Sequence, residues 1–260
     1  MTEPSRRFGG TQRLLGDAAL ARLQAAHVVV VGMGGVGSWA AEALARTGVG
    51  QLTLIDEDHV AESNINRQVH ALETTLGAPK VQVMQSRINT IAACTVNAVE
   101  DFVTVANVAE VIDPSADFVI DAIDQTAVKA AMAAQARRRS QKIVVCGAAG
   151  GRFDPLKLTR NDLAVTSGDA LLAGVRARLR RSYGYPRQHG KRFGILALHS
   201  TEQAAATDLS AKTGANSVFP LACSGYGSIM TVTASMGLAA AAAAIEYVLK
   251  SQPRAAKLAG

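Results

Sequence analysis

A glycine-rich turn directly follows a run of four valines and has the composition of a ligand site. Residues 28–37 read Val-Val-Val-Val-Gly-Met-Gly-Gly-Val-Gly. Between a strand and a helix, such a turn brings backbone N–H groups up to a phosphate at the N-terminus of the helix. The sequence therefore predicts a nucleotide-binding turn with four glycines in it: Gly32, Gly34, Gly35 and Gly37.

Asp56 closes the next apolar run, residues 52–55, and is the predicted ribose ligand. An acid at this point of a strand–turn–helix unit accepts hydrogen bonds from ribose hydroxyls. The alternative is a turn residue or helix cap, because the local sequence is Asp-Glu-Asp; Asp58, in the same turn, is expected to be solvated. The turn and Asp56 together indicate a nucleotide and leave ATP and NAD as alternatives.

A polar cluster that contains an arginine follows at residues 64–68. NAD requires no such cluster here, whereas cleavage of a triphosphate develops charge on phosphate oxygens that a planar guanidinium can hold. A lysine just after Pro79, at a predicted helix start, is expected to reach the same phosphates. The alternative is that all of these side chains are solvated surface residues that bind no ligand. The predicted triphosphate ligands are Asn64, Asn66, Arg67, Gln68 and Lys80.

Asp124 follows the apolar run 118–123 and is the predicted magnesium ligand. Mg²⁺ commonly takes one or two carboxylates together with phosphate oxygens. The alternative role is an N-cap of the next helix, and Asp121 in the same run is a candidate supporting carboxylate. The predicted catalytic residues are Arg67, Lys80 and Asp124.

Residues 176–193 form the densest basic stretch of the chain. Such runs are usually solvated, but Tyr183, Tyr185 and Phe193 are interleaved here, and that mixture suits phosphate contacts with base stacking. The net charge of +6 permits a polyanionic partner without requiring one. The segment therefore predicts RNA binding, with these basic contacts: Arg180, Arg181, Arg187, Lys191 and Arg192.

The elements that must position these residues alternate between strands and helices. Apolar runs predict strands, and helical patterns separate them, so the sequence predicts an α/β fold with a doubly wound, Rossmann-like, mostly parallel sheet. Ligands of such sheets lie at the carboxyl ends of the strands, where the glycine turn, Asp56 and Asp124 all fall. The predicted strands are 28–31, 51–56, 95–100, 117–123 and 142–146, and the predicted helices are 14–24, 38–47, 80–91, 106–112 and 126–139.

The second half is expected to extend the same sheet within one domain, 1–260. In this division 28–151 is the nucleotide-binding core, 152–228 faces the substrate and the predicted RNA, and 229–250 is a buried C-terminal helix. That last segment has nearly the length of a membrane span, but its Ala-rich composition and Glu246 favour a helix packed on the sheet. The predicted elements are a strand at 156–159, a helix at 169–181, a strand at 194–199 and a loop at 200–216.

Three cysteines are spread through the chain without any Cys-x-x-Cys pair. This spacing argues against structural zinc and a disulfide framework, and it fits a reducing cytoplasm. The N-terminus has no apolar signal core. Cys146 and Cys223 are expected to be packing residues, and a reactive thiol at Cys223 stays open.

These motifs together resemble the adenylating superfamily that includes ubiquitin-activating enzymes and bacterial ThiF and MoeB proteins, whose members use ATP and magnesium to form acyl adenylates. Within it, the chain resembles the tRNA threonylcarbamoyladenosine dehydratase group. The segments that support this second resemblance are Arg7-Phe8-Gly-Gly-Thr11, 34–48 with Trp39, Asn66-Arg-Gln68 followed by His70-Ala-Leu72, 147–151, Ser200-Thr-Glu202 and Cys223-Ser-Gly-Tyr-Gly227.

The chain departs from other branches of the superfamily. Sulfur-carrier and ubiquitin-type activators often use a cysteine in the second half, and several hold zinc with two Cys-x-x-Cys pairs. This chain has no cysteine between Cys146 and Cys223 and no Cys-x-x-Cys pair. They also begin with Arg-Tyr-x-Arg-Gln, whose second arginine acts at the partner subunit's ATP. Gly10 stands at that position here, and Arg7 and Arg13 are the candidates for its charge.

The resemblance implies a threonylcarbamoyl group on a tRNA adenine as substrate. Its carboxylate would attack the ATP α-phosphate, and Arg67, Lys80 and magnesium at Asp124 would stabilise the charge. The substrate's own urea group would then close a ring and release AMP, so no enzyme cysteine is required. No general base is evident, and the histidine candidates are His70, His189 and His199.

The resemblance further implies a homodimer and allows a sulfur-relay protein as partner. A monovalent cation in 147–151 or 223–227 is left open. Neither DNA binding nor a membrane is expected. Two other functions remain as alternatives: adenylation of the C-terminus of a small ubiquitin-like or sulfur-carrier protein, and NAD-dependent regulation through the glycine turn.

Overall fold

The structure is a computed structural model that describes residues 4–188, 190–204 and 226–251. Its centre is a seven-stranded sheet in the order β3-β2-β1-β4-β5-β7-β6. Every strand pair is parallel except β6 with β7. The predicted doubly wound, mostly parallel α/β fold is therefore confirmed, and the second half continues the sheet. The strands are β1 His27–Val31, β2 Gln51–Ile55, β3 Thr95–Val99, β4 Phe118–Asp121, β5 Lys142–Cys146, β6 Leu158–Asp162 and β7 Leu196–Ser200.

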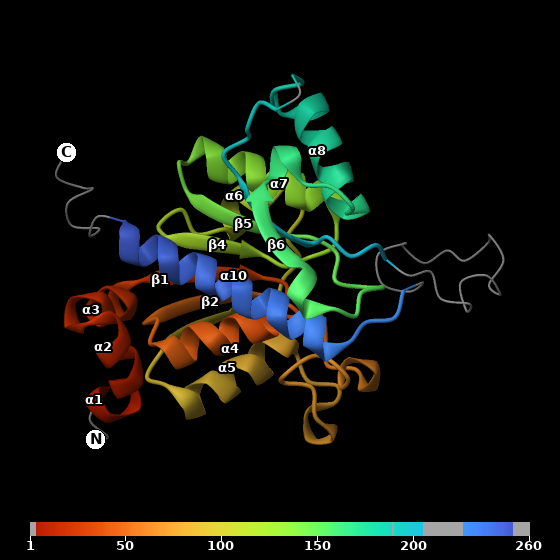
Figure 1. The fold of residues 1–260 in the computed structure, drawn as a ribbon. Coiled ribbons are helices and arrows are strands. Elements are labelled where there is room, and N and C mark those ends of the chain that lie inside the picture. Colours follow the sequence, from red (N-terminus) through yellow and green to blue (C-terminus); the bar gives the residue numbers. More distant parts are fainter. Residues whose placement is uncertain (1–3, 189, 205–225, 252–260) are drawn as a thin grey trace.

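Two hydrophobic clusters cover the two faces of the sheet. Figure 1 shows the helices that lie on both sides of it. Alternate residues of β1 belong to different clusters, with Val28 and Val30 in one and Val29 and Val31 in the other. A central parallel strand is buried on both faces, which explains its unbroken valines. The first face is covered by α3 Asp17–Ala25, α4 Gly37–Thr47, α5 Lys80–Ile91 and α10 Met230–Lys250, and the second by α6 Val108–Val111, α7 Thr126–Arg138 and α8 Ala170–Ser182.

The register of the central strands brings three chain segments to one edge. Val31, the last residue of β1, pairs with Ile55 at the end of β2 and with Asp121 at the end of β4. Because these strands are parallel, the segments that follow them leave the sheet side by side. The glycine turn, Asp56 and the segment leading to Asp124 therefore meet at this carboxyl edge.

Helix α10 crosses the sheet beside α4 (Figure 1). By length and composition alone it qualifies as a membrane span, and half of its most apolar window is buried within the protein. Its contact with α4 is very close, since a Cβ on Gly237 would lie 2.3 Å from the Val36 carbonyl oxygen. Small side chains thus let this helix pack directly on the helix that begins at the glycine turn.

Several element boundaries differ from the sequence predictions. The helix predicted over 14–24 is two helices, α2 Gly9–Leu15 and α3, because Gly16 between them has a φ of +87°. The strand predicted over 156–159 is displaced to β6, since Pro155–Lys157 forms a 3-10 turn capped by Asp154. β7 likewise begins at Leu196, after Gly194 with a φ of +73°.

Candidate nucleotide site at the carboxyl edge

The glycine turn closes tightly on itself between β1 and α4. The Gly32 N–H donates to the Ile55 carbonyl at 2.8 Å, and its φ of +91° lies in the left-handed region that favours glycine. A Cβ on Gly37 would lie 1.7 Å from the Gly32 carbonyl oxygen. Both glycines are therefore required by the turn itself, which presents the N-terminus of α4 to the edge of the sheet.

Gly34 and Gly35 have different surroundings. A Cβ on Gly34 would meet no described atom within 4 Å, so this glycine faces open space. A Cβ on Gly35 would lie 3.1 Å from Cγ of Arg67, so the arginine stem crosses closely over the turn. The open side of the turn at Gly34 is thus where a phosphate can approach the backbone.

We expect Gly34→Ala to weaken nucleotide binding without damaging the fold. The added methyl enters the space reserved for the ligand, so the dissociation constant for ATP should rise about tenfold, equivalent to about 1.4 kcal/mol. Gly37→Ala is the matched control, because its methyl collides with backbone and should unfold the turn. Calorimetric titration with ATP and thermal unfolding measure both effects; unchanged ATP affinity in Gly34→Ala would contradict this geometry.

Asp56 connects the end of β2 to the glycine turn. Its carboxylate accepts hydrogen bonds from the backbone N–H groups of Met33 and Asp58, the latter at 2.8 Å. Burial raises the pKa of this carboxyl, and Lys80 and the two N–H donors partly offset that effect. The predicted ribose ligand therefore lies against the turn, as the site requires.

Lys80, the first residue of α5, is held beside Asp56 by Asp58. Its side chain is buried, and its Nζ lies 2.6 Å from Oδ2 of Asp58. The expectation that Asp58 is solvated is confirmed, since 61% of its side chain is exposed, and the structure adds its ion pair with Lys80. The acid fixes the lysine because burying an unpaired ammonium is costly.

The loop that contains Arg67 is fixed to α4 and to the segment preceding α10. The Trp39 indole N–H donates to the Arg67 carbonyl at 2.9 Å, and Nδ2 of Asn66 donates to the Ser228 carbonyl at 3.0 Å. Nη1 of Arg67 donates to the Ser63 carbonyl and to Oδ1 of Asn66. Within the described residues these bonds engage only Nη1, so the other guanidinium nitrogens remain for a ligand.

Asn64 and Gln68 lie inside this loop rather than on its surface. Oδ1 of Asn64 accepts a hydrogen bond from the Ala61 N–H at 3.0 Å and closes a 3-10 turn. The Gln68 side chain is buried, and its Oε1 has no hydrogen-bond partner within the described part of the chain. Both residues shape the loop that presents Arg67, and their direct contact with a phosphate stays a prediction.

Asp124 lies at the same edge, three residues beyond β4. The preceding backbone packs on the glycine turn, since a Cβ on Gly32 would lie 3.0 Å from the Ala122 carbonyl carbon and oxygen. The capping alternative is not what the structure has, because the N-cap of α7 is Gln125. Asp124 is exposed, and a single exposed carboxylate beside a phosphate-facing turn fits Mg²⁺, which also takes phosphate oxygens. No cluster of three or more His, Cys, Asp or Glu side chains forms a complete metal site among the described residues.

Sequence reasoning missed Lys129, whose fully buried ammonium lies 2.8 Å from Oδ1 of Asp121. Asp121 is thus paired with a helix α7 residue instead of facing the crevice. The signal that could have found Lys129 is its helical spacing with Met132, Ala133 and Ala136 on the apolar face of α7. A lysine on such a face requires a buried acceptor.

Two of the three aromatic residues of the basic stretch are buried and not available for base stacking, while Tyr183 is partly buried. Tyr185 and Phe193 are 3% and 5% exposed and form an edge-to-face pair with centroids 4.9 Å apart. The stacking role predicted for them is therefore wrong, because they fill the core beneath α7 and α8. Arg137 stacks over the Tyr185 ring and Arg180 over the Phe193 ring.

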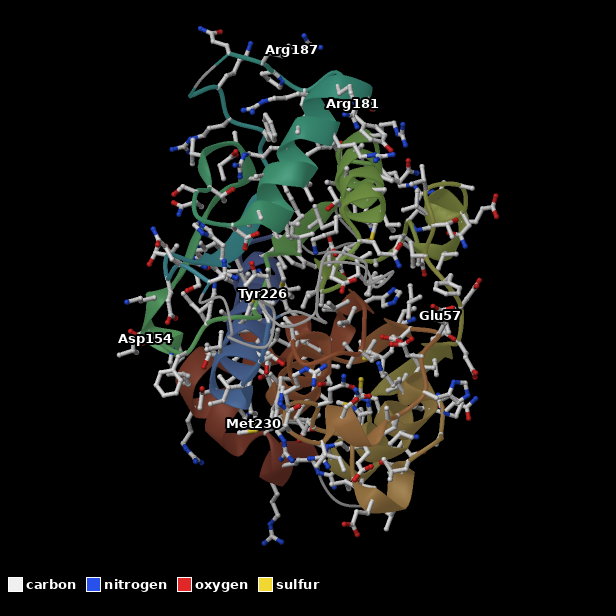
Figure 2. All side chains as sticks on the ribbon, turned by 90° about the vertical axis from the view of Figure 1, so that its right-hand side faces the viewer. Glu57, Asp154, Arg181, Arg187, Tyr226 and Met230 are labelled. Carbon is white, nitrogen blue, oxygen red and sulfur yellow. The ribbon has the colours of Figure 1, made fainter. Side chains whose placement is uncertain are left out.

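The exposed basic side chains of this stretch are Arg181, Arg187, Lys191 and Arg192. Arg180 is partly buried and donates to the Pro186 carbonyl at 3.2 Å. Figure 2 shows Arg181 and Arg187 at the top of the molecule, above Glu57, the neighbour of Asp56, which lies at mid-height. The structure therefore gathers the nucleotide residues in one place and leaves the basic surface apart from them.

The described histidine candidates for a general base are enclosed. His70 and His199 are 1% and 2% exposed, and burial lowers the pKa of both rings. Neither ring nitrogen of His70 has a hydrogen-bond partner within the described residues. These two side chains lack the access that a general base needs, and His189 lies outside the described residues.

His70 should make stability depend on pH. Burial, with Lys80 and Arg87 nearby, lowers its pKa from 6.5 to about 4. The stability gained by keeping it neutral is fully present above pH 6.5 and is lost as the pH falls toward 4, since only the unfolded chain binds the proton. Between about pH 7 and about pH 5.5 the free energy of unfolding should fall by about 1 kcal/mol. In denaturant unfolding, the free energy of unfolding of His70→Leu should not show this loss between about pH 7 and about pH 5.5. An identical dependence on pH in wild type and His70→Leu would refute the role given to His70.

The two loops proposed for a monovalent cation lie side by side where they are described. The Gly151 N–H donates to the Gly227 carbonyl at 2.8 Å. The Ala148 N–H donates to Oδ2 of Asp169 at 2.9 Å, and the Ala148 carbonyl accepts from Nη1 of Arg152. Cys223 lies outside the described residues. Cys146 is buried, and burial raises the pKa of its thiol to about 12, as for an inert core residue.

The chain is similar to one family over nearly its whole length. The family model described as the ThiF family matches residues 10–259. A curated relative, tRNA threonylcarbamoyladenosine dehydratase of Escherichia coli (strain K12), is 43% identical over an alignment of 255 residues that covers 95% of this chain and 95% of the relative.

Solved structures of E. coli tRNA N6-threonylcarbamoyladenosine dehydratase share the fold. Its complex with ATP has a TM-score of 0.86 and 40% identity, and the match covers 100% of this chain and 98% of that one. Its complex with AMP has a TM-score of 0.85 and 42% identity with the same coverage. The similarity therefore includes the second half as well as the nucleotide edge.

Proposed function

Because the chain belongs to the ThiF family, we propose that it is an ATP-dependent enzyme that dehydrates and cyclises N6-threonylcarbamoyladenosine in tRNA. The observation that favours triphosphate chemistry at this edge is the close approach of Arg67 to the glycine turn. A Cβ on Gly35 would lie 3.1 Å from Cγ of Arg67. A guanidinium beside a phosphate-facing turn stabilises charge on a cleaved triphosphate, and NAD regulation needs no such group.

In this reaction the substrate carboxylate attacks the ATP α-phosphate and forms an acyl adenylate. Gly34 admits the phosphates to the backbone, Asp56 holds the ribose, and Arg67 and Lys80 stabilise charge on the phosphates and on the leaving pyrophosphate. The substrate's urea group then closes the ring and releases AMP. Because nucleophile and adenylate belong to one molecule, the enzyme has to orient them and needs no thiol of its own.

Magnesium belongs to this proposal, with Asp124 as its protein ligand. The ion would neutralise phosphate charge. Asp124 is an exposed carboxylate at the carboxyl edge of the sheet, where the glycine turn also lies. We place the nucleotide chemistry in 28–151 and the tRNA-facing part in 152–228, with 229–250 as a supporting helix. Action on tRNA also leads us to propose a cytoplasmic location.

A homodimer is a further part of the proposal. Phe153, Leu156 and Met230 are large apolar side chains exposed to solvent, and the turn that contains Leu156 contacts α10. Apolar surface of this kind commonly marks an interface. Light scattering of the purified protein measures the assembly. A sulfur-relay partner stays an expectation from the resemblance.

A monovalent cation between the loops around Gly151 and Gly227 is also proposed, because these backbones touch. Comparing reaction rates in potassium chloride and in tetramethylammonium chloride at equal ionic strength tests it. Equal rates in the two salts would remove the cation from the proposal.

The function itself is tested with purified protein, ATP, magnesium and tRNA that carries or lacks threonylcarbamoyladenosine. After digestion of the tRNA, mass spectrometry should detect the loss of one water from the modified nucleoside only when ATP is present. Folded modified tRNA that shows no change in mass would exclude the proposed activity. ATP–pyrophosphate exchange that depends on a carrier protein would instead favour the alternative adenylation of a protein C-terminus.

A further inference from the structure

A buried ion pair lies directly beneath the proposed nucleotide edge. Nζ of Lys129 on α7 is 2.8 Å from Oδ1 of Asp121 at the end of β4, and both side chains are fully buried. Removing two charges from water is costly, and apolar side chains of similar size often stabilise a protein equally well. The pair therefore calls for a role besides stability.

The hydrogen bonds of Lys129 all go to one short segment. Its Nζ donates to the Ile123 carbonyl at 2.8 Å and lies 3.4 Å from the Asp121 carbonyl, in addition to the carboxylate contact. An ammonium has three donors. The lysine thus uses its full donor capacity on residues 121–123, and the Ile123 carbonyl belongs to the peptide group that leads into Asp124.

The same segment is held from its other side by the glycine turn. The Ala122 N–H donates to the Val31 carbonyl at 2.9 Å. Backbone atoms of Ala122 and Cγ2 of Ile123 lie 3.0 Å from the Cβ position of Gly32. Residues 121–123 therefore contact Lys129 on one side and the glycine turn on the other. They immediately precede Asp124, the proposed metal ligand.

We propose that Lys129, locked by Asp121, is a positioning residue that fixes the backbone entering Asp124 and so aims its carboxylate at the metal and phosphates. The inference rests on the proposed function, since it assumes that Asp124 is the metal ligand. Lys129 does not touch ATP or substrate. Its loss should weaken metal binding and adenylation while tRNA affinity stays the same.

The test uses the full-length protein and the double substitution Asp121→Asn with Lys129→Met. Removing both charges together avoids leaving one of them buried without a partner, so the double variant should remain folded. Arg87→Met is the matched control, because Arg87 forms an ion pair with Glu42 between α5 and α4, also at 2.8 Å.

Two measurements do not depend on turnover. Hydrogen exchange of peptides that cover 119–125 should be faster in the double variant without nucleotide, and not in Arg87→Met. The Mn²⁺ dissociation constant of the complex with a non-hydrolysable ATP analogue, followed by electron paramagnetic resonance, should rise about tenfold, equivalent to about 1.4 kcal/mol. AMP formation should require a correspondingly higher Mg²⁺ concentration, with an unchanged KM for tRNA.

Asp124→Asn separates this inference from the function on which it rests. If Asp124→Asn weakens Mn²⁺ binding but the double variant binds Mn²⁺ like wild type, the positioning role is overturned and the metal assignment stands. If Asp124→Asn leaves Mn²⁺ binding unchanged, the metal assignment fails and the positioning role fails with it. Support requires that the double substitution causes no further loss in an Asp124→Asn background, as expected when both act on one ligand.

Discussion

Replacing Asp124 by alanine is expected to abolish AMP formation while the protein stays folded. Asp124 is exposed beyond the end of β4 and is not the N-cap of α7, so its replacement opens no cavity in the hydrophobic core. In the proposed reaction this carboxylate would hold the metal that neutralises the phosphates. We expect the rate to fall by about a thousandfold, which corresponds to about 4 kcal/mol of transition-state stabilisation.

AMP release from modified tRNA, measured by chromatography together with thermal unfolding, checks this result. Asp101→Ala is a suitable control, because Asp101 is another exposed aspartate, just beyond β3, whose carboxylate accepts a hydrogen bond from the neighbouring Phe102 N–H. The control should retain normal turnover. Near-normal turnover in Asp124→Ala would contradict the magnesium assignment.

Neutralising the exposed basic residues around the end of α8 should weaken tRNA binding and reduce its salt dependence. The variant changes Arg181, Arg187, Lys191 and Arg192 to glutamine and keeps Arg180, whose guanidinium stacks on Phe193 inside the fold. Each phosphate contact contributes about 0.7 to 0.9 to the slope of log K against log salt. Four lost contacts should therefore reduce that slope by about 3 and weaken binding by at least about tenfold at moderate salt.

Filter binding of tRNA across a salt series measures the slope. A control variant removes the same number of charges from other exposed residues, namely Arg22, Arg46, Lys142 and Lys250. This control distinguishes the loss of specific tRNA contacts at α8 from the general effect of a lower net charge. If both variants change the slope equally, or neither does, the α8 surface is not the tRNA contact.

The nucleotide edge was predictable because its signals are local. Four consecutive valines predict a strand buried on both faces. The glycines after it meet the steric needs of one turn, since a Cβ on Gly37 would collide with the Gly32 carbonyl. Asp56 and Asp124 follow apolar runs, so the parallel arrangement alone brings them to this turn. The boundaries that were wrong involve single residues with backbone requirements of their own, such as Gly16.

The basic stretch shows where local signals fail. Its aromatic residues have the composition of an RNA-binding surface, yet Tyr185 and Phe193 are buried against α7. Whether a tyrosine faces solvent depends on which helix packs over it, and that helix lies about fifty residues away in the chain. No pattern within residues 176–193 contains this information.

The sequence by itself determined the fold class and the edge of the sheet where the candidate nucleotide residues meet, because the spacing of apolar residues and the residue types of a turn act between residues close in the chain. The tertiary structure decided which polar side chains hold others in place. Asp58 fixes Lys80, Trp39 fixes the Arg67 loop, and Lys129 pairs with Asp121. These choices depend on desolvation, and a charged group must be paired only once distant segments have excluded water from it.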